Sequence, residues 1–489
     1  MYKKRNREQM TVEDFAPLLG GKLDAENRWV KMSRIVPWDL VEEIYAQTFK
    51  DTRSDGRPPI SSRVAFGALY IKEFENLSQR DTLQHITENV YMQYFVGLTE
   101  FNPKPLFESA MLSQFAMRFG KEGIERINEE IYRRMQAQVD TPEDPPDNED
   151  GGSGEDGKNK GTLILDATAA PADIRYPTDL SLLNECREGT EKMIDDVWDQ
   201  TERKGHKTAY SRKKARKGYL KIAKQRKPRK NQIKQAIREQ LECLEKNIEW
   251  LEEVLPRVSA EEYLKHLWRL KTIGEIARQQ RFHFDNPGKP VPNRIVSVRQ
   301  PHIRPIVRGK ARSEVEFGQK ISLSIVEGYV FIETQSWDNF AEGTTLIESA
   351  EKYRGRHGAY PKAILADKTY RNRENISFCK EHGIRLSGPR LGRPKASEIE
   401  ADREQAYQDS CDRNEVEGRI GIGKRRYGLD LIYARLESTG EVEAAMNILA
   451  MNVAHVLRVL LRSFRKLSEL LVFRLKLLRE YSCLDFLAA

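Results

Sequence analysis

The sequence lacks the features of secreted and membrane proteins. Its five cysteines are scattered over 489 residues without a C-x-x-C pair, which argues against a disulfide framework and a thiolate zinc site and fits a reducing compartment. No stretch reaches 18 uncharged apolar residues, and the charged residues 1–10 have no apolar core of a secretory signal. We therefore expect a cytoplasmic protein that does not span a membrane.

Common hydrolase and nucleotide-binding motifs are also missing. The eight histidines share no metal-ligand spacing, and no G-x-S-x-G sequence occurs. Residues 418–424 do satisfy the G-x-x-x-x-G-K pattern of a phosphate-binding loop. However, Arg425 stands where that loop needs Ser or Thr for Mg²⁺, and no apolar strand precedes the pattern. The sequence therefore argues against nucleotide hydrolysis.

The residues that are present indicate a folded protein of several units with one strongly basic segment. Apolar residues make up 39% of the chain, which is enough to form hydrophobic cores, and the chain is longer than one compact core usually holds. The formal charge is only +8. Residues 203–230, however, contain 14 Lys or Arg and no acid, so the charge is segregated.

Periodicity and composition divide the chain into five parts. These are a helical N-terminal unit (1–139), an acidic flexible linker (140–160), a mixed α/β unit in two pieces (161–184 and 291–440), a basic helical insertion (185–290) and C-terminal packing helices (441–489). The last part is strongly apolar, but Asn447, Asn452, His455 and Arg458 interrupt it. A buried helix is therefore favoured over a membrane span.

Local signals refine this division. Strands are predicted at 162–166, 294–298, 315–325, 329–334, 363–367 and 384–387. The Glu327-Gly328 pair predicts a tight turn between the third and the fourth of these strands. In the N-terminal unit, Ser78 is a predicted helix N-cap. The surrounding pattern fits a DNA-binding helix-turn-helix and a plain helical hairpin equally well.

Three acids stand where catalytic carboxylates could gather. Asp166 and Asp367 each end an apolar strand, and ligands of α/β folds bind at the carboxyl ends of strands. Glu417 follows Arg413 at helical spacing, which puts both on one helix face. The rival acid Glu415 would lie about 160° away around that helix. Carboxylates suit Mg²⁺ or Mn²⁺, although each residue alone also fits a turn or a surface ion pair.

The order of strand-Asp, long gap, strand-Asp and R-x-x-x-E-x-x-x-x-x-x-K resembles the DDE transposases of bacterial insertion sequences. Arg413, Glu417 and Lys424 match the spacing of that signature, and Ser410 occupies its tyrosine position. Residues 315–320, 367–370 and 77–80 are also similar to the family. The resemblance implies an α/β ribonuclease H-like catalytic domain with a large helical insertion, preceded by an all-α N-terminal domain.

The resemblance also implies an activity and a site. Asp166, Asp367 and Glu417 would bind two Mg²⁺ or Mn²⁺ ions, while Arg413 and Lys424 position DNA. The protein would cleave and rejoin the terminal inverted repeats of its own insertion sequence, as a homodimer on double-stranded DNA in a prokaryotic cytoplasm. Two alternatives stay open: a metal-dependent nuclease that does not join strands, and a domesticated DNA-binding protein without activity.

The basic insertion supplies a second candidate DNA contact. Its densest run contains the cations Arg212, Lys213, Lys214, Arg216 and Lys217. Such a run suits a DNA backbone, and Tyr210 and Tyr219 add rings that could stack on an exposed base. A solvated basic segment is the alternative.

Overall fold

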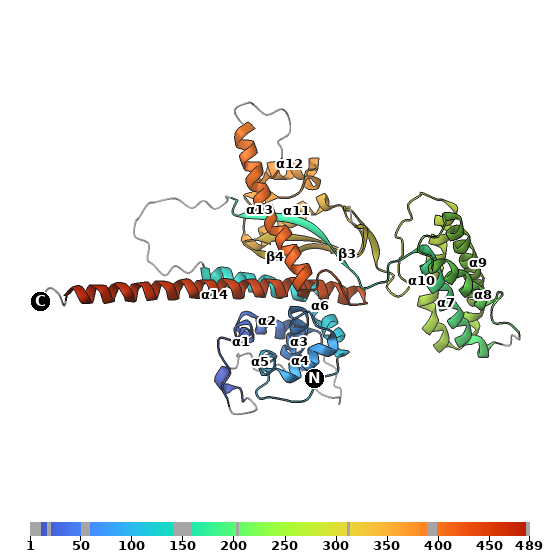
Figure 1. Ribbon diagram of the computed structural model, residues 1–489, viewed down its shortest axis with the longest axis horizontal. Helices are drawn as coiled ribbons and strands as arrows, with labels where there is room; N and C mark the ends of the chain where they lie inside the picture. Colours follow the sequence, from blue (N-terminus) through green and yellow to red (C-terminus); the bar gives the residue numbers. More distant parts are fainter. Residues whose placement is uncertain are drawn as a thin grey trace.

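The computed structural model describes residues 11–16, 21–49, 59–139, 159–201, 205–310, 313–388 and 399–485. A helical N-terminal unit, a mixed sheet with its helices, and a separate helical insertion are arranged around one long C-terminal helix (Figure 1). Most of the predicted linker, residues 140–158, lies outside the described residues.

The N-terminal unit is a bundle of helices. They are α1 (Arg28–Ile35), α2 (Trp38–Gln47), α3 (Ser62–Phe74), α4 (Gln79–Glu88), α5 (Val90–Phe95) and α6 (Met111–Val139, kinked at Gly120). Ser78 caps α4 as predicted, because its hydroxyl accepts from the backbone N–H of Asp81. Buried aromatic rings of α1, α3 and α5 pack edge to face in the centre: Trp29, Phe74 and Phe95.

The sheet is mixed, with β1 in its middle. Its strands are β1 (Thr162–Pro171), β2 (Arg304–Lys310), β3 (Ser313–Val326), β4 (Tyr329–Ser336), β5 (Ala363–Leu365) and β6 (Arg385–Leu386). β1 pairs antiparallel with β3 and parallel with β5. β3 also pairs antiparallel with β2 and β4, and β5 pairs in parallel with β6. The spatial order is therefore β4–β3–β1–β5–β6, with β2 extending the β4 edge of β3.

The β3–β4 hairpin forms as predicted. Val326 is paired with Tyr329, so Glu327 and Gly328 make a two-residue turn, and both have positive φ angles (51° and 82°). Gly328 is needed there for a second reason, since a Cβ atom would lie 2.7 Å from the Arg419 side chain. The turn thus packs directly against the helix that contains Arg419, Ile399–Arg426.

One predicted strand is wrong and one strand was not predicted. Residues 294–298 form no strand, although Val296 and Val298 are buried. The backbone N–H of Ile295 donates to the side chain of Gln279, so the segment satisfies its backbone outside the sheet. The unpredicted strand is β2, where Pro305, together with Pro301 shortly before the strand, suppresses the sequence signal.

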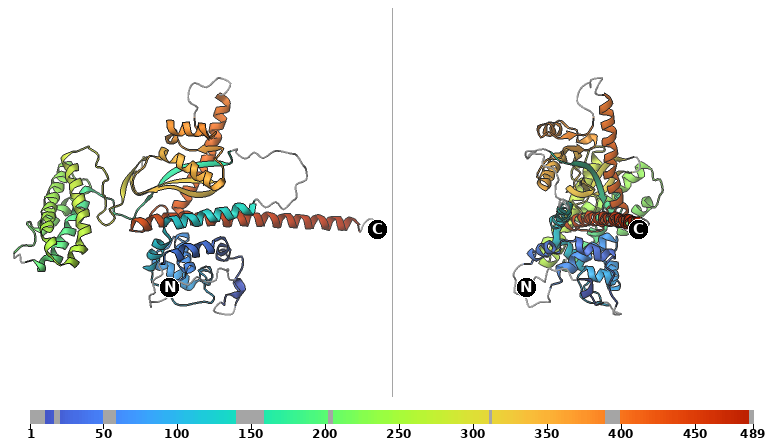
Figure 2. Two further views of the ribbon diagram at one scale, coloured as in Figure 1. Left: turned by 180° about the vertical axis from the view of Figure 1, so that it is seen from behind. Right: turned by 90° about the vertical axis from the view of Figure 1, so that its left-hand side faces the viewer.

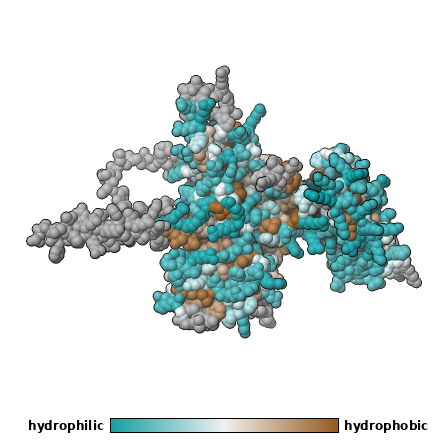
Figure 3. Space-filling view, in the orientation of Figure 1, coloured by the Kyte–Doolittle hydropathy of each residue, from teal (hydrophilic) through white to brown (hydrophobic). Residues whose placement is uncertain are grey.

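The insertion is a helical bundle with its own core. Its helices are α7 (Asp179–Val197), α8 (Arg212–Ala223), α9 (Lys230–Val254) and α10 (Ala260–Asp285). Leu241, Leu244 and Leu251 of α9 lie on one helix face in that core and are fully buried. The bundle stands beside the sheet and joins it through the chain ends of α7 and α10 (Figure 2). Figure 3 shows that its visible face is mostly hydrophilic.

Three helices accompany the parallel part of the sheet, and a fourth passes beneath it. The three are α11 (Leu346–His357), α12 (Arg373–Glu381) and α13 (Ile399–Arg426). The fourth, α14 (Glu437–Asp485), runs between the N-terminal bundle and the sheet and contacts α6, α3 and β4 (Figure 1).

Within the described residues, one helical segment is long and apolar enough to cross a membrane, Glu437–Arg462 of α14. Of its apolar window, 61% is buried inside the protein. Burial of this kind is typical of a core helix, which agrees with the predicted packing role.

Candidate active site

Asp166 and Asp367 belong to two neighbouring parallel segments: Asp166 lies in β1, and Asp367 comes just after β5. β1 and β5 pair with Ile164 opposite Leu365, and continuing this register by two residues places Asp166 opposite Asp367. Asp367 lies just beyond β5, where its carboxylate caps the short 3₁₀ helix η5 (Lys368–Tyr370). By this register the two aspartates lie opposite each other just beyond the end of β5. β1, however, continues to Pro171, so Asp166 lies in the middle of its strand and not at the end as predicted.

Glu417 and Arg413 lie on the helix that packs against these strands. α13 contacts both β1 and β5, and Arg413 Nη1 is 3.9 Å from Asp367 Oδ1. Arg413 and Glu417 both act electrostatically on Asp166. The i, i+4 spacing therefore puts both charges within range of Asp166, with Arg413 beside Asp367 and Glu417 exposed on the same helix. Lys424 lies two turns further along the same continuous helix, which Gly421 and Gly423 do not end.

The rival acid Glu415 belongs to a different neighbourhood. It forms an ion pair with Arg419 at 3.7 Å and lines a small cavity beside Thr162 and Ile164. It is not among the charges that dominate the environment of Asp166. Of the two acids, Glu417 is therefore the one whose charge acts on Asp166.

The environment of Asp166 favours binding of a positive charge. Burial raises the pKa of its carboxyl, and the negative charges of Glu342 and Glu417 raise it further. The backbone N–H of Ala167, which donates to Asp166 Oδ1 at 2.8 Å, and the guanidinium of Arg413 oppose this effect. A partly buried carboxylate among like charges is stabilised by a cation.

The chemistry of this donor set fits a hard divalent ion such as Mg²⁺ or Mn²⁺, which prefers carboxylate oxygens. As the side chains stand, no three His, Cys, Asp or Glu residues in the described ranges are close enough together to hold a metal. Arg413 supplies the positive charge beside Asp367 instead, and its buried Nε has no hydrogen-bond partner among the described residues. The Asp367 side chain is 50% exposed, so it has room to turn toward an ion.

The G-x-x-x-x-G-K pattern is not a phosphate-binding loop. Residues 418–424 lie entirely within α13, so their backbone N–H groups are committed to the helix and cannot surround a phosphate. The structure thereby supports the argument against nucleotide hydrolysis.

The basic run of the insertion forms α8, and four of its five predicted DNA contacts are exposed: Lys213, Lys214, Arg216 and Lys217. The fifth, Arg212, is not unopposed as the sequence suggested. Its Nη1 lies 2.7 Å from Asp195 of α7, which also pairs with Lys207 at 3.2 Å. Asp195, an acid of a neighbouring helix, thus neutralises part of the basic segment 203–230.

The expected stacking role of two tyrosines is wrong. Tyr219 is 8% exposed and packs in a small core with Ile222 and Ala236. The hydroxyl of Tyr210 is 2.8 Å from Glu191 Oε1 and accepts from the amide of Asn247. Both side chains make contacts within the insertion, Tyr219 through its ring and Tyr210 through its hydroxyl. A tyrosine beside a basic run can pack inside a protein as readily as it can stack on a base.

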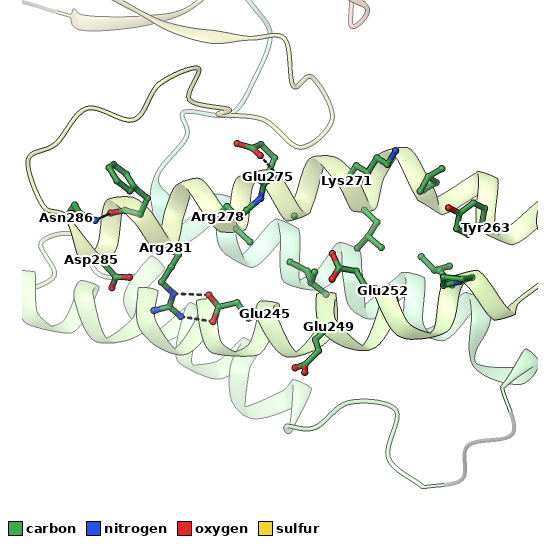
Figure 4. Close-up of a pocket in the computed structure, with 18 residues that line it drawn as sticks. Glu245, Glu249, Glu252, Tyr263, Lys271, Glu275, Arg278, Arg281, Asp285 and Asn286 are labelled. Atoms are coloured by element: carbon green, nitrogen blue, oxygen red, sulfur yellow. Dashed lines mark hydrogen bonds and ion pairs between the residues drawn. The ribbon is translucent and has the colours of Figure 1, made fainter.

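An open cavity of about 1110 Å³ lies between α9 and α10, far from the carboxylates. Figure 4 shows Arg281 of α10 reaching across it to Glu245 of α9, with hydrogen bonds of 2.8 and 2.7 Å. Its other acidic residues are Glu249, Glu252, Glu275 and Asp285. Such an acidic lining repels phosphate, so this groove does not suit DNA.

The surroundings of α4 favour the helical-hairpin alternative over a DNA-reading helix-turn-helix. Residues 76–79, at the start of α4, line a cavity of about 630 Å³ together with residues 433–436. The Gln79 amide also donates to Ser113 of α6 at 3.0 Å. A recognition helix needs its N-terminal residues free to reach base edges, whereas these residues face other parts of the chain.

Sequence reasoning did not single out Glu342, the acid with the largest charge effect on Asp166. Glu342 stands at the start of a helical segment that continues into α11, where an acid is expected simply to favour a helix N-terminus. Only the folded contact between that segment and the sheet reveals it.

Two family models match the chain. Residues 364–454 match the transposase DDE domain, and residues 18–118 match a transposase domain of the DUF772 family. The first match includes Asp367, Arg413, Glu417 and Lys424, but it begins after Asp166.

A curated relative, named "Uncharacterized protein ORF8 in nfe locus" from Rhizobium meliloti, is 22% identical over 168 residues, which cover 34% of this chain and 73% of that protein. No solved structure matches significantly. The two domain matches agree with the motif order in the sequence. They identify the chain as a member of the DDE transposases of insertion sequences.

Proposed function

We propose that the protein cleaves the terminal inverted repeats of its own insertion sequence and rejoins them to target DNA by phosphoryl transfer with two Mg²⁺ or Mn²⁺ ions. It would act as a homodimer on double-stranded DNA in the cytoplasm of a prokaryote. One observation carries the proposal: the β1–β5 pairing ends with Ile164 opposite Leu365, so that Asp166 and Asp367 each follow two residues later, and the charge of Glu417 on α13 acts on Asp166.

The strand order supports a ribonuclease H-like fold for the catalytic unit. β1, β3 and β4 are antiparallel neighbours, while β5 and β6 add to the other side of β1 in parallel. The helical insertion enters between β1 and β2. This arrangement leaves the carboxyl end of β5 and the neighbouring middle of β1 for the reaction.

Asp166, Asp367 and Glu417 would hold the ions. Bound ions of this type activate the attacking oxygen and stabilise the leaving oxygen of an in-line displacement. In cleavage, a water oxygen attacks phosphorus, the bond from phosphorus to the 3′ oxygen breaks, and a 3′-hydroxyl is released. In joining, that 3′-hydroxyl attacks a target phosphate and frees a target 3′-hydroxyl.

The cations of α13 have a binding role in this scheme. Arg413 already stands beside the Asp367 carboxylate. A DNA phosphate bound at the site could replace that carboxylate as the ion-pair partner of Arg413. Lys424 lies on the same helix, about three turns beyond Arg413. Both side chains would orient the DNA backbone so that the attacking oxygen, the phosphorus and the leaving oxygen lie in line.

The proposal is tested with a duplex made from the genomic DNA that flanks the gene, a supercoiled target plasmid and Mg²⁺ or Mn²⁺. A transposase cuts at the repeat ends and yields joined plasmid products. A nuclease yields cut ends alone, and an inactive DNA-binding protein yields only a mobility shift. Absence of cutting with both metals would overturn the proposed function.

A further inference from the structure

We propose that Glu342 is a fourth metal-binding carboxylate of the active centre, and that Lys320 is the cation that occupies it before a metal ion binds. The inference rests on the proposed function, because it extends the set formed by Asp166, Asp367 and Glu417.

Lys320 of β3, which is buried, and Glu342, which is partly buried, form an ion pair at the sheet. Lys320 Nζ lies 3.1 Å from Glu342 Oε1, and the two side chains are only 11% and 27% exposed. Lys320 Nζ also donates to the backbone oxygen of Phe340 at 2.8 Å. Buried ion pairs add little net stability compared with apolar side chains. A pair in this place therefore calls for a reason other than stability.

The backbone that carries Glu342 is fixed to the sheet on one side. Glu342 begins the 3₁₀ helix η4 (Glu342–Thr345), whose last hydroxyl, Thr345 Oγ1, is 3.2 Å from Ser322 Oγ of β3. Ser322 pairs with Ala167, the residue directly after Asp166. Glu342 is thus held near the middle of β1 by a short, rigid connection.

On its other side, η4 packs against the turn that begins at Asp367. The backbone oxygen of Gly343 accepts from the Asn375 amide at 2.6 Å. A Cβ atom at Gly343 would lie 2.5 Å from the backbone oxygen of Thr369, so this close approach requires glycine. Glu342 therefore stands between the two segments that carry Asp166 and Asp367.

A buried hydroxyl marks the space among these groups. Tyr370 is fully buried, and its hydroxyl makes no well-aligned hydrogen bond to a described residue, although Ser322 and Thr345 are near. The charges of Glu342 and Asp166 both act on this hydroxyl. A buried polar group without a well-placed partner beside two carboxylates indicates a place for a ligand such as an ion with its water.

The distribution of charge supports the same conclusion. Each of two acids has its own cation: Arg413 beside Asp367 and Lys320 beside Glu342. Entry of divalent ions would displace both cations, and the freed ammonium and guanidinium could then bind phosphate.

The test is Mn²⁺ binding to the full chain, followed by the electron paramagnetic resonance signal of free Mn²⁺. Glu342→Gln removes a ligand and should weaken binding about tenfold or more. Lys320→Gln breaks the same ion pair but removes a competing cation, so binding should stay equal or become tighter. A purely structural ion pair would shift both variants in the same direction, and that result would overturn the proposal.

A further variant guards against misfolding. Glu342→Gln leaves the Lys320 charge buried without its partner, whereas the double variant Lys320→Met/Glu342→Gln leaves no unpaired charge. The double variant should bind Mn²⁺ as weakly as Glu342→Gln. Wild-type affinity in the double variant would overturn the fourth-ligand role.

Asp166→Asn separates this inference from the function on which it rests. If Asp166→Asn loses Mn²⁺ binding while Glu342→Gln keeps it, Glu342 is not a ligand and the proposed three-acid centre stands. If Asp166→Asn binds Mn²⁺ like the wild type, the metal centre itself is wrong, and the inference about Glu342 is overturned with it.

Discussion

Asn452 of α14 bonds to both backbone groups of Val330 in β4. Its Oδ1 accepts from the Val330 N–H at 2.9 Å, and its Nδ2 donates to the Val330 oxygen at 2.7 Å and to Asn128 Oδ1 of α6 at 2.8 Å. β4 pairs with β3, and these bonds satisfy backbone groups of β4 that β3 does not reach. A polar residue that is unsuited to a membrane thus joins α14 and α6 to the sheet.

This relationship predicts a large loss of stability on substitution of Asn452. Asn452→Leu should lower the free energy of unfolding by about 2 kcal/mol or more, because it leaves the buried Val330 N–H without the Asn452 oxygen and Asn128 Oδ1 without the Asn452 amide, while the Val330 oxygen keeps the amide of Asn128. Asn447, one and a half turns earlier on α14, is the matched control: it is 1% exposed, and neither of its amide atoms has a hydrogen-bond partner among the described residues. Asn447→Leu should therefore leave stability equal or higher. Urea unfolding measures both, and equal losses would contradict the assigned role.

A contact between α13 and α14 predicts a pH dependence of stability. Arg419 Nη2 lies 2.9 Å from His455 Nδ1, and burial, with the charges of Arg419 and Arg458, lowers the pKa of His455 to about 4. A histidine in the unfolded chain has a pKa of about 6.5. Between about pH 6.5 and about pH 4, His455 is therefore protonated in the unfolded chain and largely neutral in the folded one. The free energy of unfolding then falls as the pH drops through that window.

His455 should account for about 1 to 2 kcal/mol of the free energy of unfolding that is lost between about pH 7 and about pH 4, after allowance for its partial exposure. It is measured as the difference between the wild type and His455→Gln in unfolding experiments from about pH 7 to about pH 4. The variant should show the smaller loss of stability on acidification. Parallel curves for the two proteins would show that His455 titrates normally in the folded state.

The exposed cations of α8 predict a salt-dependent role in DNA binding. Neutralising Lys213, Lys214, Arg216 and Lys217 should weaken binding to specific and random duplexes alike. The slope of log K against log[salt] should flatten by about 0.9 for each DNA phosphate that these cations no longer neutralise. Arg212→Gln should flatten it less, because Asp195 already neutralises Arg212. An unchanged slope would leave α8 a solvated helix, and weaker binding of the terminal repeat alone would indicate base reading.

Local sequence signals predicted those parts of the fold in which neighbouring residues decide the structure. The cap at Ser78 and the turn at Glu327-Gly328 depend on one side chain or on two φ angles, and both are present. The apolar runs before Asp166 and Asp367 are strands for the same reason. Helical spacing sufficed to put Arg413 on the face of α13 that approaches Asp367.

Contacts between distant segments decided the rest, and the sequence carries no local signal for them. Tyr219 is buried because α8 folds back on α9. Arg212 is neutralised by an acid of another helix, Asp195. The closeness of Glu342 to Asp166 arises only when η4 docks between β3 and the turn after β5. Composition and periodicity do not report such pairings.

The central claim is that Asp166, Asp367 and Glu417 act together in DNA cleavage, and single-turnover cutting of a terminal-repeat duplex in Mg²⁺ tests it most directly. Asp166→Asn, Asp367→Asn and Glu417→Gln should each abolish cutting while the affinity for the duplex stays the same or rises, because an amide cannot replace the charge of a ligand and repels phosphate less. The matched control is Glu415→Gln, two residues from Glu417 but paired with Arg419, and it should cut at nearly the wild-type rate. Wild-type cutting by any of the three variants, or equal loss in Glu415→Gln and Glu417→Gln, would contradict the account.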